Sequence, residues 1–209
     1  MYKKRFFFIV FEGTEGTGKS FQINKLFISL KKKKFKVIKT REPGGCKSAE
    51  KIRNLIFNNQ LKLDDLTDYY LMLASRNEHL KKIIIPAKKN KSIIISDRFV
   101  DSTVAYQVVE KKIDKKLNDI NEKYILKKIK PNLTIVLKSN YTQISKRLNK
   151  RKKSNKFDKL KKTFLLNVQN TFIKIAKKNK KNYVVLDSSG NNDKLEKKIL
   201  SIILKKLSS

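Results

Sequence analysis

The chain has 209 residues, of which 39% are hydrophobic, and this is enough for one sizeable core in a single domain spanning 1–209. Its formal net charge is +34 at pH 7, but the lysines occur along nearly every predicted helix and loop, so we expect no dedicated nucleic-acid site. No apolar run is long enough to cross a membrane, and the single cysteine, Cys46, excludes an internal disulfide. We therefore expect a soluble, cytoplasmic protein with no membrane partner.

The first predicted element is a buried strand from Phe6 to Phe11, which leads directly into a glycine-rich loop. The loop fits the pattern G-x-x-x-x-G-K-[ST], in which backbone N–H groups surround nucleotide phosphates. Apolar residues over 23–30 then repeat at the spacing of one buried helix face. Eight residues are expected to bind ATP: Gly13, Thr14, Glu15, Gly16, Thr17, Gly18, Lys19 and Ser20. Lys19 would reach the β and γ phosphates, and Ser20 would hold Mg²⁺ through its hydroxyl.

Strands and helices alternate along the rest of the chain. Four further strands are predicted, over Phe35–Thr40, Ser92–Ser96, Leu133–Lys138 and Tyr183–Leu186. Helices are predicted over about 49–56, 64–89, 101–110, 115–130, 144–148, 164–175 and 195–203. This alternation predicts an α/β fold with a doubly wound, five-stranded parallel sheet, the fold of the P-loop nucleotide kinases. It gathers the loops that follow the strands, including all six glycines, at one edge of the sheet.

Three arginines, Arg41, Arg76 and Arg98, lie at or near that edge in a chain whose other cations are mostly lysine. Phosphoryl transfer between two nucleotides brings two highly charged groups together, so the site must neutralise both and hold them in line. The planar fork of arginine suits bidentate recognition of a phosphate or a base. For each of the three, an ordinary surface position is the alternative.

Three further motifs resemble the thymidylate kinase family: TREPGG at Thr40–Gly45, ASRNEHL at Ala74–Leu80 and SDRFVDSTVAYQ at Ser96–Gln107. They stand in the family's order beside the phosphate loop, and the match runs end to end, weakening after about Arg151. The resemblance implies that ATP phosphorylates dTMP to dTDP, in dTTP synthesis, with Mg²⁺ as cofactor. It also implies a homodimer.

The resemblance assigns a set of residues to dTMP: Glu15, Arg41, Met72, Arg76, Arg98, Thr103, Tyr106 and Gln107. Arg41 and Arg98 would bind the phosphate of dTMP, and Glu15 would face its 3′-hydroxyl. Arg76 and Thr103 would hydrogen-bond the thymine edge. Tyr106 would lie against the deoxyribose, and Gln107 would line the same pocket.

The remaining implied roles concern ATP and the reaction itself. Asp97 resembles the acidic residue that acts near Mg²⁺ through water. Arg147 resembles the residue that packs on adenine, and the loop from Asp187 to Gly190, with Ser188, would border that base. The catalytic set is therefore expected to comprise Lys19, Asp97, Arg98 and Arg151. Arg151, in a lid over about 148–162, is our candidate for the arginine that stabilises transition-state charge, with Arg147 second.

Three positions depart from the family pattern. Met72 replaces a phenylalanine that stacks on thymine, which predicts weaker affinity for thymidylate. Val108 replaces a glycine. In the lid, the pattern D-R-x-E is replaced by Asp158–Lys161, and the segment before Phe164 is about three residues shorter than usual.

Three alternatives to a thymidylate kinase follow from these features. Met72 favours a kinase for another nucleoside monophosphate. The net charge favours a basic P-loop protein that binds nucleic acid. The altered lid favours an enzyme that keeps the fold with little activity.

Overall fold

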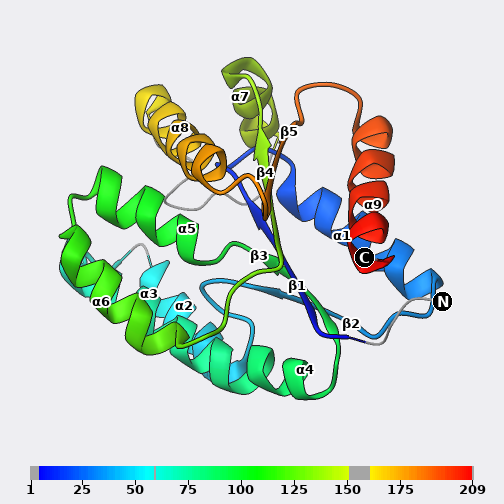
Figure 1. Cartoon of the computed structure of the whole chain (residues 1–209). Helices are drawn as coiled ribbons and strands as arrows, with labels where there is room; N and C mark the ends of the chain where they lie inside the picture. The colour runs from blue at the N-terminus through cyan, green and yellow to red at the C-terminus, as the bar shows by residue number, and fades with distance from the viewer. Residues whose placement is uncertain (1–4, 59, 151–160, 209) are drawn as a thin grey trace.

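The computed structural model describes residues 5–58, 60–150 and 161–208, in which a central parallel sheet lies between helices (Figure 1). The strands are β1 (Phe7–Glu12), β2 (Val37–Arg41), β3 (Ile93–Asp97), β4 (Leu133–Lys138) and β5 (Tyr183–Asp187). They pair in the order β2-β3-β1-β4-β5, and every pairing is parallel. The predicted sheet is confirmed, with each strand within two residues of its predicted bounds.

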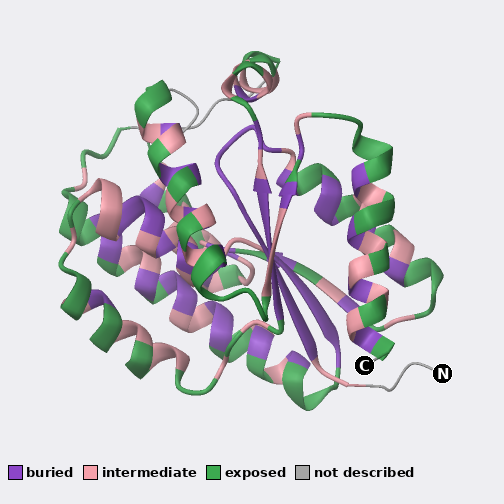
Figure 2. Ribbon diagram, turned by 45° about the horizontal axis from the view of Figure 1, so that its top comes forward, coloured by how far each residue is buried: buried purple, intermediate pink, exposed green. Residues whose placement is uncertain are grey.

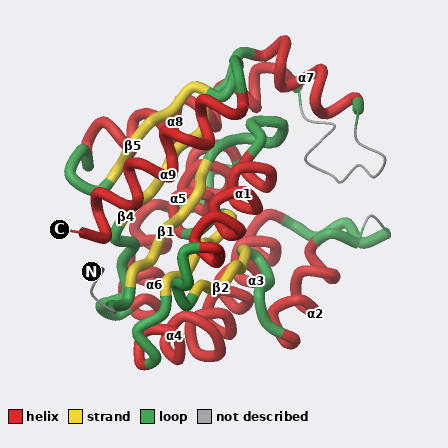
Figure 3. Tube along the Cα trace, turned by 90° about the vertical axis from the view of Figure 1, so that its right-hand side faces the viewer, coloured by secondary structure: helices red, strands yellow, loops and turns green. Residues whose placement is uncertain are grey.

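Both faces of the sheet are covered, which explains the continuous apolar runs of the central strands β1 and β3 (Figure 2). Phe7, Ile9 and Phe11 of β1 pack with α1 (Lys19–Lys32) and α9 (Asn192–Ser208), the two helices that lie in front of the strands in Figure 3. Phe8 and Val10 point to the opposite face and pack with η1 (Leu80–Ile84) and α4 (Ile85–Lys89). The alternation along one strand therefore builds two cores.

The other helical segments surround the second face and the edge of the sheet where the strands end. They are α2 (Lys47–Ile56), α3 (Asp65–His79), α5 (Val100–Thr103), η2 (Val104–Glu110), α6 (Lys115–Leu126), α7 (Tyr141–Asn149) and α8 (Lys162–Lys178). None of the helices within the described ranges is both long and apolar enough to cross a membrane.

Three predicted helices are divided or shortened in the structure, among them the one predicted over 101–110, which consists of α5 and η2. The helix predicted over 64–89 consists of α3, a π-helical turn (η1) and α4, which follow one another directly, with Pro86 in the first turn of α4. The helix predicted over 115–130 ends at Leu126, because Lys127 has a φ of +52°, a conformation that does not continue a right-handed helix.

The strand register brings the candidate functional residues together. Asp97 at the end of β3 pairs with Phe11 of β1 on one side and with Arg41 of β2 on the other. The backbone N–H of Arg98 then donates to the carbonyl of Phe11. The phosphate loop, Arg41, Asp97 and Arg98 therefore start from one row at the carboxyl edge of the sheet, where open α/β sheets bind ligands.

Candidate functional site

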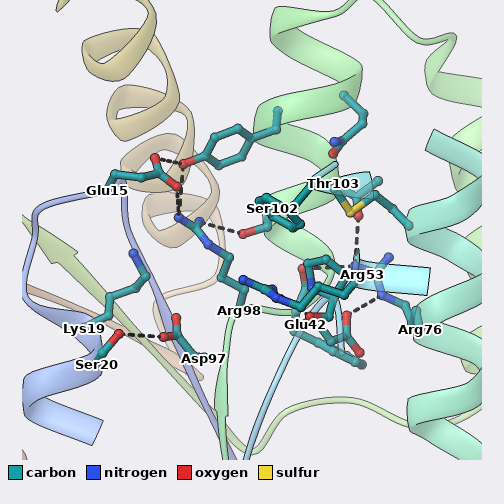
Figure 4. Close-up of a pocket in the computed structure, with 16 residues that line it drawn as sticks. Glu15, Lys19, Ser20, Glu42, Arg53, Arg76, Asp97, Arg98, Ser102 and Thr103 are labelled. Carbon is teal, nitrogen blue, oxygen red and sulfur yellow. Dashed lines mark hydrogen bonds and ion pairs between the residues drawn. The ribbon is translucent and has the colours of Figure 1, made fainter. Parts of the chain in front are cut away.

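One pocket at the carboxyl edge of the sheet joins the phosphate loop to the arginine-bearing segments (Figure 4). Its walls come from the phosphate loop, the loop after β2, α2, α3, the loop after β3, and the helical segment formed by α5 and η2. Elements far apart in the sequence thus face one cavity, as the motif order predicts.

The phosphate loop, residues 13–20, has a shape that only glycine permits at its first position. Gly13 has a φ of +143°, and a Cβ atom there would lie 2.4 Å from the carbonyl oxygen of Leu137 in β4. At the other end, Gly18 adopts a left-handed conformation, and α1 begins at the next residue. The N-terminus of α1 therefore opens at the loop, which favours binding of an anion.

The Lys19 side chain folds back over this loop. Its Nζ donates to the carbonyl oxygens of Gly13 and Thr14, both at 2.8 Å. Burial lowers the pKa of Lys19 to about 8, and the nearby charge of Arg98 acts in the same direction, while Asp97, Glu15 and Glu12 oppose it. An entering phosphate would raise this pKa again, because it brings negative charge to the ammonium group.

Ser20 and Asp97 form an oxygen-rich corner beside Lys19. Ser20 Oγ donates to Asp97 Oδ2 at 3.1 Å, and Asp97 Oδ1 is buried with no hydrogen-bond partner among the described residues. A hydroxyl and a carboxylate with a free oxygen suit Mg²⁺, which prefers oxygen ligands and keeps several waters. The described ranges contain no cluster of three or more His, Cys, Asp or Glu side chains that could hold a metal ion by itself.

Glu15 of the phosphate loop meets Arg98 and Tyr106 inside the pocket. Arg98 Nη2 donates to Glu15 Oε1 at 2.6 Å, and the Tyr106 hydroxyl donates to Glu15 Oε2 at 2.6 Å. Burial raises the pKa of Glu15, but the charges of Arg98 and Lys19 and the Tyr106 hydrogen bond outweigh it, so the pKa lies below its ordinary value. The Glu15 carboxylate is therefore held in its ionised form between the phosphate loop and the segment that carries Arg98 and Tyr106.

Glu12 lies beneath the pocket, and sequence reasoning missed it. Its Oε1 accepts from the backbone N–H of Phe99 at 2.8 Å, and its Oε2 accepts from Ser102 Oγ at 2.7 Å. Ser102 Oγ in turn accepts from Arg98 Nη1 at 3.0 Å. Arg98 has a φ of +74°, so these bonds hold its loop in a conformation that is uncommon for a non-glycine residue.

Arg76 of α3 is buried at the far end of the pocket. Its Nε donates to Glu42 Oε2 at 2.8 Å, and its Nη2 donates to Thr103 Oγ1 at 2.8 Å and to the carbonyl of Phe99 at 3.1 Å. Figure 4 shows this guanidinium beside Glu42 and Thr103. Arg76 is therefore a fixed wall of the cavity, and the alternative of an ordinary surface arginine does not hold.

The far wall combines predicted and unpredicted residues. Met72, Thr103 and Gln107 line the pocket, as the resemblance implies. Arg53 and Phe57 line it as well, with the Arg53 guanidinium 4.4 Å from the centre of the Phe57 ring. Sequence reasoning missed both, because α2 carries no motif and its helical spacing does not reveal which face meets the cavity.

Two predicted arginines lie outside this pocket. Arg41 makes a two-pronged contact with Glu50, at 3.1 and 2.7 Å, and lines an adjacent cavity with Ser20 and Asp97. Arg147 donates to the carbonyl oxygens of Gly16 and Ser188, at 3.2 and 2.7 Å. Arg147 thus bridges the phosphate loop and the loop after β5.

The proposed catalytic lid falls mostly outside the described residues. Arg151 and the irregular segment Asp158–Lys161 belong to this stretch, apart from Lys161 itself. The described parts of the lid are the end of α7 and the start of α8.

Known proteins resemble this chain over nearly its full length. A family model described as thymidylate kinase matches residues 11–199. The thymidylate kinase of Mycoplasma capricolum is 37% identical over 203 residues, covering 96% of this chain and 95% of the relative. That of Caldicellulosiruptor saccharolyticus is 38% identical over 200 residues, covering 94% and 95%. A crystal structure of thymidylate kinase from Ehrlichia chaffeensis superposes with a TM-score of 0.77 at 29% identity, covering 95% of this chain and 99% of that one.

Proposed function

The chain belongs to the thymidylate kinase family, which phosphorylates dTMP to dTDP, and we propose that the pocket at the carboxyl edge of the sheet holds dTMP against the phosphate loop for this reaction. One observation carries the proposal: the pocket is lined by Lys19 and Ser20 at one end and by Arg76 and Met72 at the other. A donor phosphate on the loop and an acceptor nucleotide in the cavity would then share one space, which in-line transfer requires.

The acceptor phosphate would meet Arg98, and its sugar would meet Glu15 and Tyr106. The buried contacts among these three residues support this placement, because they orient a guanidinium and a carboxylate before the ligand arrives. Arg76 would read the thymine edge together with Thr103 and Gln107. Arg53 lines the same cavity and would add a further cation to Lys19, Arg76 and Arg98.

The donor would be ATP, with its phosphates on residues 13–20 and its base near Arg147 and Ser188. Ser20 and Asp97 would hold Mg²⁺, and the free buried oxygen of Asp97 supports this assignment. The ion would neutralise phosphate charge when bound. Lys19 would exchange its bonds to the loop carbonyls for bonds to the phosphates, which replaces weak acceptors with charged ones.

We also propose that the chain works as a homodimer in the cytoplasm. Five large apolar side chains are exposed on α2, α3 and α6: Leu55, Leu66, Tyr70, Ile120 and Tyr124. These helices lie together on one side of the molecule (Figure 1), which supports a second copy as the partner. Sedimentation should give a dimer for the wild type and a smaller species for Tyr70→Lys combined with Tyr124→Lys.

A coupled assay of ADP release tests the proposed reaction, with dTMP, dUMP, dCMP, dGMP and AMP offered in turn. We expect turnover with dTMP above all others, and its loss in Lys19→Ala. Lys25→Ala is the matched control, because Lys25 lies on the same helix but forms a partly exposed pair with Glu196. Turnover that ignored every monophosphate but rose with added RNA or DNA would instead support the nucleic-acid alternative, which the net charge of +34 favours.

A further inference from the structure

His79, the only histidine of the chain, is the centre of a buried hydrogen-bonded series behind the pocket. Its Nε2 lies 2.7 Å from Thr40 Oγ1, and its Nδ1 lies 2.8 Å from Glu42 Oε1. The other oxygen of Glu42 accepts from Arg76 Nε at 2.8 Å. The His79 side chain is fully buried and does not line the pocket, so it cannot touch a ligand there.

This hydrogen-bonded series depends on the alternation of side chains at the end of β2 and on the spacing of residues along α3. Thr40 and Glu42 flank Arg41, and since side chains alternate along an extended chain, both face His79 while Arg41 points away to Glu50. Arg76 and His79 are three residues apart on α3, so they lie on one helix face. A single carboxylate, that of Glu42, can therefore bind both.

The loop after β2 is seated closely on α3 at this point. A Cβ atom on Gly45 would lie 2.4 Å from Thr40 Oγ1 and 2.7 Å from His79 Cδ2. Gly44 donates its backbone N–H to Ser75 Oγ at 3.0 Å. Gly45 thus allows the loop to approach close enough for the histidine to bond both Thr40 and Glu42.

The Glu42 carboxylate is ionised and is bound by both Arg76 and His79. Burial raises the pKa of Glu42, but the Arg76 charge and the His79 hydrogen bond outweigh it and keep the pKa below its ordinary value. An ionised carboxylate between a guanidinium and an imidazole makes short, charge-assisted bonds. His79 therefore helps to set the direction of the Arg76 fork, whose terminal nitrogens are also bound by Thr103, the Phe99 carbonyl and Glu122.

We propose that His79 is a positioning residue for the acceptor nucleotide, acting through Glu42 on the side chain of Arg76. This rests on the proposed binding of dTMP in the pocket. The contact with Thr40 holds the imidazole against the end of β2, and the contact with Glu42 holds the carboxylate that Arg76 Nε binds. The direction of Arg76 at the proposed base end of the pocket therefore depends partly on this imidazole.

Two substitutions separate the two bonds of the imidazole. An asparagine side chain places a polar atom near the position of Nδ1, so His79→Asn keeps the contact with Glu42 and loses the contact with Thr40. A glutamine side chain reaches the position of Nε2, so His79→Gln keeps the contact with Thr40 and loses the contact with Glu42. We expect His79→Gln to raise KM for dTMP about tenfold, as one charge-assisted bond is lost, with kcat and KM for ATP within about twofold. His79→Asn should stay within about threefold of wild type for KM of dTMP.

Histidine NMR on tag-free wild-type protein provides a test that needs no variant. Because the chain has one histidine, its imidazole gives one set of signals. We expect saturating dTMP to shift them, and ATP alone to leave them in place.

The outcomes are distinct. Unshifted imidazole signals while calorimetry shows dTMP bound, or equal KM values in wild type and His79→Gln, would overturn the positioning role. A wild type that neither binds nor phosphorylates dTMP would refute the proposed function itself. If both variants fail to fold, the wild-type NMR result decides.

Discussion

Glu15 and Arg98 are joined by a contact of 2.6 Å between Oε1 and Nη2, although 83 residues separate them in the sequence. Their side chains are 9% and 16% exposed, so the pair is poorly screened by water. The phosphate loop and the loop after β3 therefore hold each other in place at the point where donor and acceptor would meet.

Replacing Glu15 by Gln should loosen this contact. The neutral amide no longer balances the Arg98 charge, and hydrogen bonds to charged groups contribute about 1.5–3 kcal/mol. We expect kcat/KM for dTMP to fall about 10- to 100-fold, with KM for ATP little changed. Steady-state kinetics would measure this, with Glu196→Gln as control, since its pair with Lys25 is partly exposed and lies on α9. An unchanged kcat/KM for dTMP in Glu15→Gln would show that the charged contact between Glu15 and Arg98 is not needed for the reaction.

Arg151→Ala should slow turnover by about 10³ and leave dTMP binding nearly unchanged, because the phosphate loop has no basic residue at Thr14 or Glu15 to meet transition-state charge. Rapid-quench kinetics and calorimetry would measure the two effects separately. Lys152→Ala is the matched control, since it removes a neighbouring charge without removing an arginine fork. Wild-type kcat in Arg151→Ala would transfer the role to another residue, with Arg147 tested next.

Met72→Phe should tighten dTMP binding. Stacking of a base on an aromatic ring contributes about 1–3 kcal/mol, whereas methionine contacts recover about 0.3–1.5 kcal/mol. We expect the Kd for dTMP to fall by roughly 3- to 10-fold, measured by calorimetry. Met72→Leu keeps the apolar bulk without the ring and serves as control. Weaker binding by Met72→Phe would mean that the wall formed with Phe57 and Gln107 has no room for a second ring.

Glu12→Gln should change how stability depends on pH. Burial raises the pKa of Glu12 from 4.5 to about 8, and Asp101 adds to this, while Arg98 and the Ser102 and Phe99 bonds oppose it. The folded state therefore holds a proton that the unfolded state releases, so the contribution of Glu12 to stability is full below pH 4.5 and is lost as the pH rises to about 8. Glutamine cannot titrate, so the variant lacks this pH dependence. The difference in the free energy of unfolding, wild type minus Glu12→Gln, should therefore decrease as the pH rises from 4.5 to about 8.

Urea unfolding at pH 5, 6.5 and 8 would measure that difference. Glu196→Gln again serves as control, because its carboxylate lies outside the buried cluster. A difference for Glu12→Gln that stayed constant, or rose with pH, would show that Glu12 is ionised throughout.

The sequence by itself determined the five strands, the parallel sheet and the loop that holds phosphate. These features depend on neighbours within a few residues: apolar runs make buried strands, and glycines at fixed spacing allow the backbone conformations of residues 13–18. The family motifs also marked Arg76, Thr103 and Gln107, which the structure brings to one pocket.

Tertiary packing alone decided which side chains meet. It turned Arg41 toward Glu50 and away from the pocket, brought Arg53 into it from a helix without a motif, and placed His79 between Thr40 and Glu42. The contacts of His79 join residues 39 and 37 positions apart, and the geometry of all these contacts depends on how α2 and α3 pack against the end of β2. Local spacing records which face of a helix is apolar, but not which polar group on that face finds a partner across the core.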